Sequence, residues 1–293
     1  MNTIQELPEL AIGSALHYSN DPIYIGYCNE ADIISIPKDS RINLLKLNPI
    51  EIIPEYGESQ KGYEDFSSNN FYELVQLKWL LLSEMFNKGY SYVVYSDLDV
   101  VWNRNASEEV TSIFETIKSA QIVLQNFTTS LSDPKLCMGF AGFRNSSITH
   151  DFIEEARVVH KNELKSNPKT GDDDVVTLLY KQLNFPGWIV PLPQSTFPVG
   201  NLLNLYSTKP VMPGLKAPIP FIFHSNFVVG LQNKRLMSRL FVCSLKYAFR
   251  DATVKPKFTN IRMSTYWVLI LSLKRLRHFV AFYRKKLLSI FSN

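Results

Sequence analysis

The chain has 293 residues, of which 45% are hydrophobic and 20% charged, and its formal net charge at pH 7 is +4. This composition is that of an ordinary globular protein, and it excludes collagen-like, disordered and membrane-bundle classes. No apolar run of about 18 residues occurs, so no transmembrane helix is predicted.

The N-terminal segment and the cysteines favour a cytoplasmic protein. Residues 1–14 lack the basic start and the long apolar core of a secretory signal. Cys28, Cys137 and Cys243 are odd in number and scattered, which argues against a disulfide framework and against a zinc site.

The charge is distributed unevenly and predicts two parts. Residues 245–293 contain eleven Lys or Arg and one acidic residue, whereas residues 1–244 contain 20 basic and 26 acidic residues. A basic tail after an acidic body predicts a tail that meets an anionic partner. Nucleic-acid binding is not expected, because the net basic charge is confined to the tail and the body is acidic.

Predicted strands and helices alternate along the first half of the chain. The expected strands are 22–36, 48–55, 90–102 and 120–126, and the expected helices are 69–89, about 107–119 and about 147–163. This order predicts an α/β fold with a sheet that is mostly parallel in its first half. After residue 185 the chain is rich in proline, which indicates a less regular, mixed second half.

Two aspartates interrupt the apolar run VVYSDLDVVW, residues 93–102. Ligands of open α/β sheets bind beyond the carboxyl ends of the strands, where Asp97 and Asp99 are expected. The pair therefore predicts a cation site, and the alternative is a strand that ends in a polar turn capped by Asp97.

Lys78 is a candidate partner for this pair. It lies within the apolar stripe of the predicted 69–89 helix, where an unpaired ammonium is costly. Its side chain either reaches to the rim of the helix or pairs with Asp97 or with a bound phosphate.

The segment PFIFHSNFVVGLQNK, residues 220–234, offers a further ligand. If it is extended, His224 and Asn226 share one face. His224 is either a satisfied core residue or, with the aspartates, part of an ordinary ligand set for Mn²⁺. Gly230 and Lys234 suit a phosphate, since a glycine allows close backbone approach and a lysine supplies charge.

Three consecutive acids begin the predicted helix TGDDDVVTLLY, residues 170–180. The helix macrodipole favours acids there, and capping needs only one of them. The three acids therefore predict either a solvated cap or a carboxylate that points into a cleft.

Five segments, taken in this order, resemble the nucleotide-diphospho-sugar transferases of the GT-A fold. They are LKWLLLSEMFNKGYSYVVYSDLDVVWNRN, CMGFAGFRNS, GDDDVVTLLYKQ, STFPVGN and HSNFVVGLQNK. The resemblance covers roughly residues 20–240 and is nearest to the retaining family of plant and slime-mould α-xylosyl-, α-galactosyl- and arabinosyltransferases. It implies a Rossmann-type mixed sheet flanked by helices over 1–244, followed by the basic tail.

The resemblance also implies roles for individual residues. Asp97, Asp99 and His224 would hold Mn²⁺ or Mg²⁺, with Asp99 as the direct ligand. Where the family has Asp-Gln at the acidic helix start, we assign Asp173 as catalytic and place Asp174 in the glutamine-like position. The implied donor contacts are Asn29 at the nucleobase, Met138 and Gly139 at the sugar, and Lys78, Asp97, Asp99, Asn226, Gly230 and Lys234 elsewhere.

The implied activity is transfer of a sugar from a nucleotide diphosphate sugar, with UDP as the expected nucleotide, to a glycan or lipid-linked acceptor with retention. One alternative is a haloacid-dehalogenase-type phosphatase with Asp97 as its nucleophile. Another is a protein of the same fold that binds sugar nucleotide or glycan without turnover.

The last 30 residues, 264–293, read as a basic amphipathic helix. An apolar stripe opposite a cationic face suits a helix lying on an anionic membrane surface, here the inner face of a membrane. Such a location favours a lipid-linked acceptor and polysaccharide biosynthesis. The alternative is a helix packed on the domain with a solvated basic face.

Overall fold

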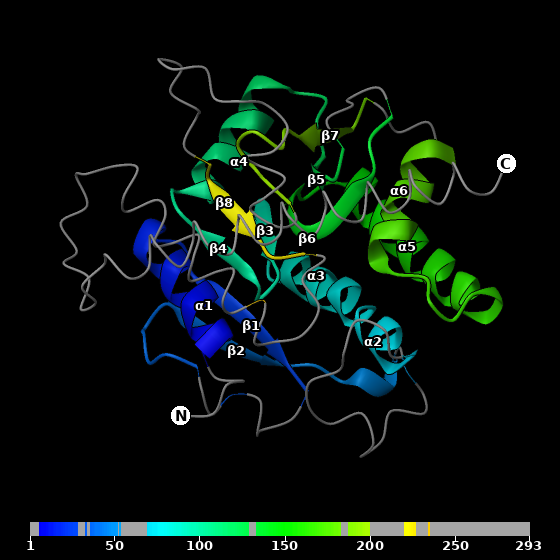
Figure 1. The fold of residues 1–293 in the computed structure, drawn as a ribbon, viewed down its shortest axis with the longest axis horizontal. Coiled ribbons are helices and arrows are strands. Elements are labelled where there is room, and N and C mark those ends of the chain that lie inside the picture. The colour runs from blue at the N-terminus through cyan, green and yellow to red at the C-terminus, as the bar shows by residue number, and fades with distance from the viewer. Residues whose placement is uncertain are drawn as a thin grey trace, which may run out of the picture. The chain divides into compact units, whose positions relative to one another are not determined.

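A computed structural model describes residues 6–28, 33, 36–51, 53, 69–128, 133–182, 187–199, 220–226 and 234 (Figure 1). The predicted basic tail, including the 264–293 helix, lies outside these residues. Within the described part of the chain, no helix is long and apolar enough to cross a membrane.

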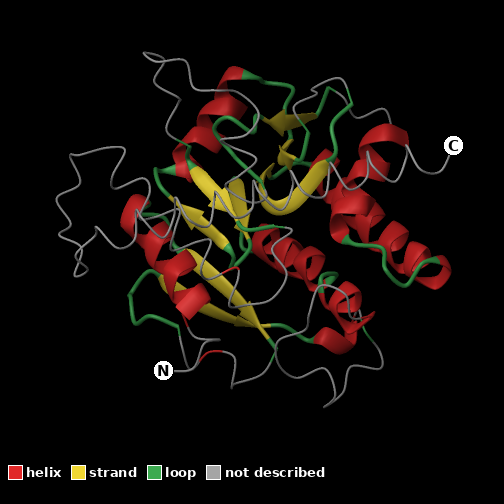
Figure 2. Ribbon diagram, viewed as in Figure 1, coloured by secondary structure: helices red, strands yellow, loops and turns green. Residues whose placement is uncertain are grey.

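The described strands, which are yellow in Figure 2, form three hydrogen-bonded groups. Their bounds are β1 Ile23–Tyr27, β2 Ile42–Lys46, β3 Tyr92–Ser96, β4 Val100–Trp102, β5 Ile122–Asn126, β6 Leu136–Arg144, β7 Ile189–Leu192 and β8 Ile222–His224. β1 and β2 pair in parallel, the central sheet has the order β3-β6-β5-β7, and β4 pairs with β8 antiparallel.

Helices cover both faces of the central sheet. Their bounds are α1 Glu6–Tyr18, α2 Asn69–Leu74, α3 Leu77–Asn87, α4 Ala106–Thr116, α5 Ser147–Ser166 and α6 Asp172–Gln182, with a short 3₁₀ helix, η2, at Pro49–Glu51. One buried cluster joins the sheet to α3, α5 and α6, and a second joins its other face to α4 and β4. β5 contributes side chains to both clusters, because alternate residues of a strand point to opposite faces of the sheet. Leu124 lies in the first cluster and Val123 in the second.

Two expectations about the strands are wrong. The described residues of the 48–55 segment, 48–51 and 53, form no strand, since Pro49 begins the 3₁₀ helix η2 and the second strand is β2. Proline has no N–H to give to a strand ladder, and β2 ends before it. β6, which was not predicted, is antiparallel to both of its neighbours, so the central sheet is mixed rather than mostly parallel.

The predicted 69–89 helix exists but is divided. A turn at Val75–Gln76 separates α2 from α3, and the chain leaves α3 through Gly89, whose φ is +83°. Gly89 donates its N–H to the carbonyl of Phe86. Only glycine adopts this backbone conformation readily, which explains why the helix ends here.

A bulge in β6 lies at the centre of the sheet. Leu124 pairs with Ala141, but the next residue of β5, Gln125, pairs with Cys137. Met138–Phe140 therefore have no partners in β5, as extra residues in one strand of a pair do, although Phe140 still pairs with Ser96 of β3. The carbonyl of Gly139 accepts the N–H of Asp97 at 2.7 Å, so the bulge holds the turn after β3.

Candidate active site

The structure brings Asp97, Asp99 and His224 together. Both aspartates lie in the turn between β3 and β4, and the β4–β8 pairing places His224 opposite Val100. One ligand atom of each residue lies within 4.8 Å of the other two, and Nε2 of His224 is 3.2 Å from Oδ1 of Asp99. His224 is far from the two aspartates in sequence, yet the three side chains meet as expected.

The charges around Asp99 keep its carboxylate ionised. Burial alone would raise its pKa, but His224 and Lys234 outweigh that effect and hold the pKa well below its usual value. Lys234 Nζ lies 2.5 Å from Oδ2 of Asp99. A buried carboxylate that stays ionised requires positive charge beside it. Two carboxylates and an imidazole are a suitable donor set for Mn²⁺, so these residues fit a divalent cation.

Lys78 pairs with carboxylates rather than only reaching to the rim of its helix. Its Nζ lies 3.0 Å from Oδ2 of Asp97 and 2.5 Å from Oδ2 of Asp172. Burial lowers the pKa of Lys78, but Asp172 and Asp97 outweigh it, so the pKa lies well above its usual value. The Tyr95 hydroxyl donates to Oδ1 of Asp97 at 2.5 Å, which satisfies the second oxygen of that carboxylate.

The three acids at the start of α6 separate into different environments. Asp172 is buried and binds Lys78. Oδ1 of Asp173 accepts the N–H of Met138 at 2.8 Å, which ties α6 to the bulge of β6. Asp174 is exposed and accepts the N–H of Gly171 at 3.0 Å, so it caps its own helix. The sequence left a helix cap and an inward-pointing carboxylate as alternatives. The structure contains both, since Asp174 is the cap and Asp172 points inward to Lys78.

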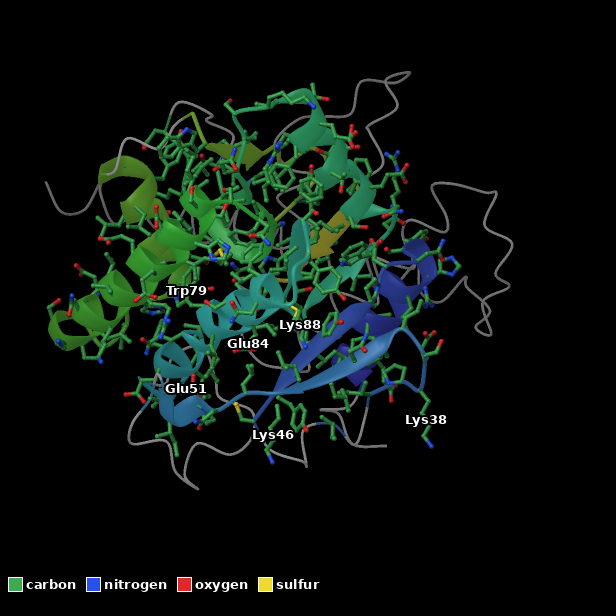
Figure 3. The ribbon with its side chains drawn as sticks, turned by 180° about the vertical axis from the view of Figure 1, so that it is seen from behind. Lys38, Lys46, Glu51, Trp79, Glu84 and Lys88 are labelled. Carbon is green, nitrogen blue, oxygen red and sulfur yellow. The ribbon has the colours of Figure 1, made fainter. Side chains whose placement is uncertain are left out.

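A buried histidine sets the position of this helix start. His160 accepts a hydrogen bond from Trp79 Nε1 at 3.2 Å, and its other nitrogen lies 3.1 Å from the carbonyl oxygen of Thr170. Figure 3 shows Trp79 on the part of α3 that faces α5. Burial lowers the pKa of His160 and favours the neutral ring that this bonding needs. Sequence reasoning missed both Asp172 and His160 as parts of the site.

Gly139 makes room for His224. A Cβ atom at Gly139 would lie 1.9 Å from Cε1 of His224, so any side chain there displaces the ring. Met138 is buried in the core behind it, and Asn226 is buried with its amide on Cys137 Sγ at 3.6 Å. The predicted donor contacts Asn29 and Gly230 lie outside the described residues.

A cavity of about 740 Å³ reaches the turn that carries the aspartates. It lies between α1, β1, α3 and β3, with walls that include Ile12, Ala15, Tyr24, Leu81 and Val94, and it extends to Asp97. An apolar pocket that ends at a charged group is the usual form of a small-molecule site.

Asp173 is expected to make the stability of the protein depend on pH. Burial and the neighbouring Asp172 raise its pKa to about 7. A carboxylate whose pKa is higher in the folded state destabilises that state increasingly as the pH rises from its unfolded to its folded pKa. Asp173→Asn should therefore stabilise the metal-free protein by up to roughly 4 kcal/mol above pH 7 and very little near pH 4.

Urea unfolding of the wild type and of Asp173→Asn in EDTA at pH 4, 6 and 8 measures this difference. Asparagine keeps an oxygen for the Met138 N–H, so the comparison changes mainly the ionisation. A constant difference between the two proteins across this pH range would contradict the raised pKa of Asp173.

Comparison with known proteins agrees with this arrangement. Residues 39–237 match the profile of a family described as nucleotide-diphospho-sugar transferase. No curated protein matches the chain. The galactosyltransferase LgtC, in complex with donor and acceptor sugar analogues, has 12% identity and a TM-score of 0.52 over 87% of this chain and 95% of that chain. Mouse xyloside xylosyltransferase 1 has 12% identity and a TM-score of 0.47 over 77% and 93%. The likeness to LgtC establishes the fold, a mixed α/β fold of the GT-A type, as expected.

Proposed function

The chain belongs to the nucleotide-diphospho-sugar transferase family, and we propose that within this family it is a metal-dependent enzyme that moves a sugar from a UDP-sugar to a glycan or glycolipid acceptor. We further propose that the transfer retains the anomeric configuration. As a member of this family the chain is a glycosyltransferase that uses a nucleotide-sugar donor, which removes the phosphatase alternative.

The convergence of Asp97, Asp99 and His224 carries this proposal. The donor substrate has a diphosphate, and breaking its bond to the sugar adds negative charge to that group. Mn²⁺ or Mg²⁺ held by these three residues would supply the positive charge that stabilises the leaving diphosphate.

Residues of the chain perform the remaining tasks in the proposal. Lys234, beside Asp99, is placed to share the negative charge of the diphosphate. Lys78 neutralises Asp97 and Asp172 and so keeps the turn after β3 fixed against α6. We assign Asp173, anchored on the bulge of β6, to the reacting sugar, and Asp174 to the glutamine-like position beside it.

Measurement of sugar release from a panel of nucleotide sugars, with Mn²⁺, with Mg²⁺ and with EDTA, tests the proposed function. We expect release from one or more UDP-sugars that EDTA abolishes and Mn²⁺ restores. NMR of the transfer product should show the anomeric configuration of the donor. Release that is unaffected by EDTA, or product of inverted configuration, would overturn the corresponding part of the proposal.

We also propose that the chain divides at residue 244 and that its basic tail lies on an anionic membrane surface. The support is the charge of 245–293 and the amphipathic pattern of 264–293. Deletion of 264–293 should move the protein from the membrane pellet to the supernatant after cell fractionation.

A charge-only variant is the matched control for this deletion. Replacing Lys274, Arg275, Lys285 and Lys286 with glutamine keeps the apolar stripe but removes the attraction to anionic lipid, worth about 1 kcal/mol for each charge. Partial release is therefore expected. If both variants fractionate like the full chain, the tail is not the membrane contact.

A further inference from the structure

Gln125 is a buried polar residue that the proposed reaction does not use. It lies in β5 opposite the bulge of β6 and is 0% exposed. Its Nε2 lies 3.3 Å from each of the carbonyl oxygens of Phe197 and Pro198, and its Oε1 lies 2.9 Å from Nδ1 of His224. The amide therefore contacts a loop on one side and the metal-site histidine on the other.

Hydrogen-bond chemistry fixes which way the Gln125 amide points. Carbonyl oxygens only accept, so the NH₂ group must face Phe197 and Pro198. A flipped amide would set its oxygen against two other oxygens and bury all three without a proton between them, which is costly. Oε1 of Gln125 consequently faces His224, and as an acceptor it requires a proton on Nδ1.

This proton determines what the other nitrogen of His224 can do. A neutral imidazole carries a single N–H, and with that N–H on Nδ1 the lone pair of Nε2 is exposed. Nε2 is the nitrogen that lies 3.2 Å from Oδ1 of Asp99. When Nε2 carries no proton, its lone pair faces the carboxylate oxygen of Asp99, and a cation bound between the two atoms stabilises this arrangement.

The neighbours of the ring support the same assignment. Cys137 Sγ lies 3.7 Å from Nδ1 and already receives N–H groups from Gly139 and Asn226, so it acts as an acceptor on this side. Gly139 lies directly against Cε1 of His224, which holds the ring in its plane.

We propose that Gln125 is a positioning residue of the cation site: it selects the Nδ1–H tautomer of His224 and fixes the ring so that Nε2 binds the ion. The inference rests on the proposed role of His224 as a cation ligand. Hydrogen-bond partners of metal-ligating histidines elsewhere contribute about 10–100-fold to metal affinity. Gln125→Met, which keeps the length of the side chain but removes the acceptor, should weaken Mn²⁺ binding by a similar factor of roughly 10–100.

Two further variants separate this role from a packing effect. Gln125→Glu, buried as the neutral acid, keeps an oxygen for Nδ1–H and an O–H to donate toward Phe197 and Pro198, and it should recover most of the affinity that Gln125→Met loses. Gln121→Met makes the same chemical change beside the start of β5, without contact to His224, and should bind Mn²⁺ like the wild type.

The test is a titration of each full-length protein with Mn²⁺ alone, followed by the EPR signal of the free ion, with circular dichroism to confirm folding. ¹⁵N NMR of the histidine rings in the Mg²⁺-loaded wild type gives an independent readout, and we expect His224 to carry its proton on Nδ1 and not on Nε2. Unchanged affinity in a folded Gln125→Met variant, or an Nε2–H tautomer in the wild type, would overturn the inference alone. Failure of the wild type to bind Mn²⁺, or equal binding by His224→Ala, would overturn it together with the proposed cation site.

Discussion

Asp99→Ala should abolish metal-dependent release of sugar from the donor. The carboxylate of Asp99 faces His224 Nε2 on one oxygen and Lys234 Nζ on the other, so its loss removes a proposed ligand and the anchor of a second cation. Loss of one group that stabilises developing charge typically lowers kcat by about 10²–10³-fold, and loss of the cation itself should cost more. Initial rates with saturating Mn²⁺ and UDP-sugar measure the effect.

The controls distinguish loss of charge from general damage. Asp99→Asn keeps the shape of the side chain and should also be inactive, because a neutral amide lacks the negative charge that attracts a divalent ion. Asp133→Ala removes an exposed aspartate that pairs with Lys181 on the surface, and it should leave the rate unchanged. Substantial Mn²⁺-dependent activity in folded Asp99→Ala would remove Asp99 from the proposed metal site.

Much of this site could be predicted from sequence because its residues interrupt patterns. Asp97 and Asp99 stand out in an apolar strand, and His224 stands out in another, so each one requires a partner. The α/β order then predicts that side chains beyond strand ends meet. The family resemblance supplied the pairing of the two segments, which no local pattern contains.

The residues that sequence reasoning missed depend on geometry that only the folded chain has. Asp172 and Asp174 are chemically identical neighbours, and the rotation of α6 alone turns one toward Lys78 and the other toward its own helix end. Gln125 reaches His224 because the bulge shifts the pairing of β5 with β6, and a bulge leaves no clear trace in the sequence.

The strand β6 was missed for a related reason. LCMGFAGFR is buried along nearly its whole length, so it shows no alternation of polar and apolar residues. Two glycines within it also weaken any strand prediction. One of them, Gly139, is needed because the ring of His224 occupies the space of a side chain. The glycine that the site needs at position 139 thus weakens the strand prediction for β6.

Lys78→Met should be among the most destabilising single substitutions in this domain. The Lys78 side chain is 13% exposed and forms ion pairs with both Asp97 and Asp172, and the Asp172 side chain is itself 9% exposed. Methionine fills a similar volume but leaves carboxylates buried without a cation. Breaking a buried ion pair in this way typically costs about 3–5 kcal/mol. Urea unfolding at pH 7 in EDTA gives the free energy of unfolding for both proteins.

Two comparisons test the electrostatic origin of that loss. Lys161→Met makes the same change at an exposed lysine of α5, and it should alter stability by no more than about 0.5 kcal/mol. The triple variant Lys78→Met, Asp97→Asn, Asp172→Asn removes the unpaired charges and should recover most of the lost stability, since neutral groups are far cheaper to bury than ions. Recovery is expected in stability alone, because the same variant lacks the acidic turn that the proposed reaction needs. A triple variant as unstable as Lys78→Met would show that Lys78 acts through the packing of its alkyl chain and not through its charge.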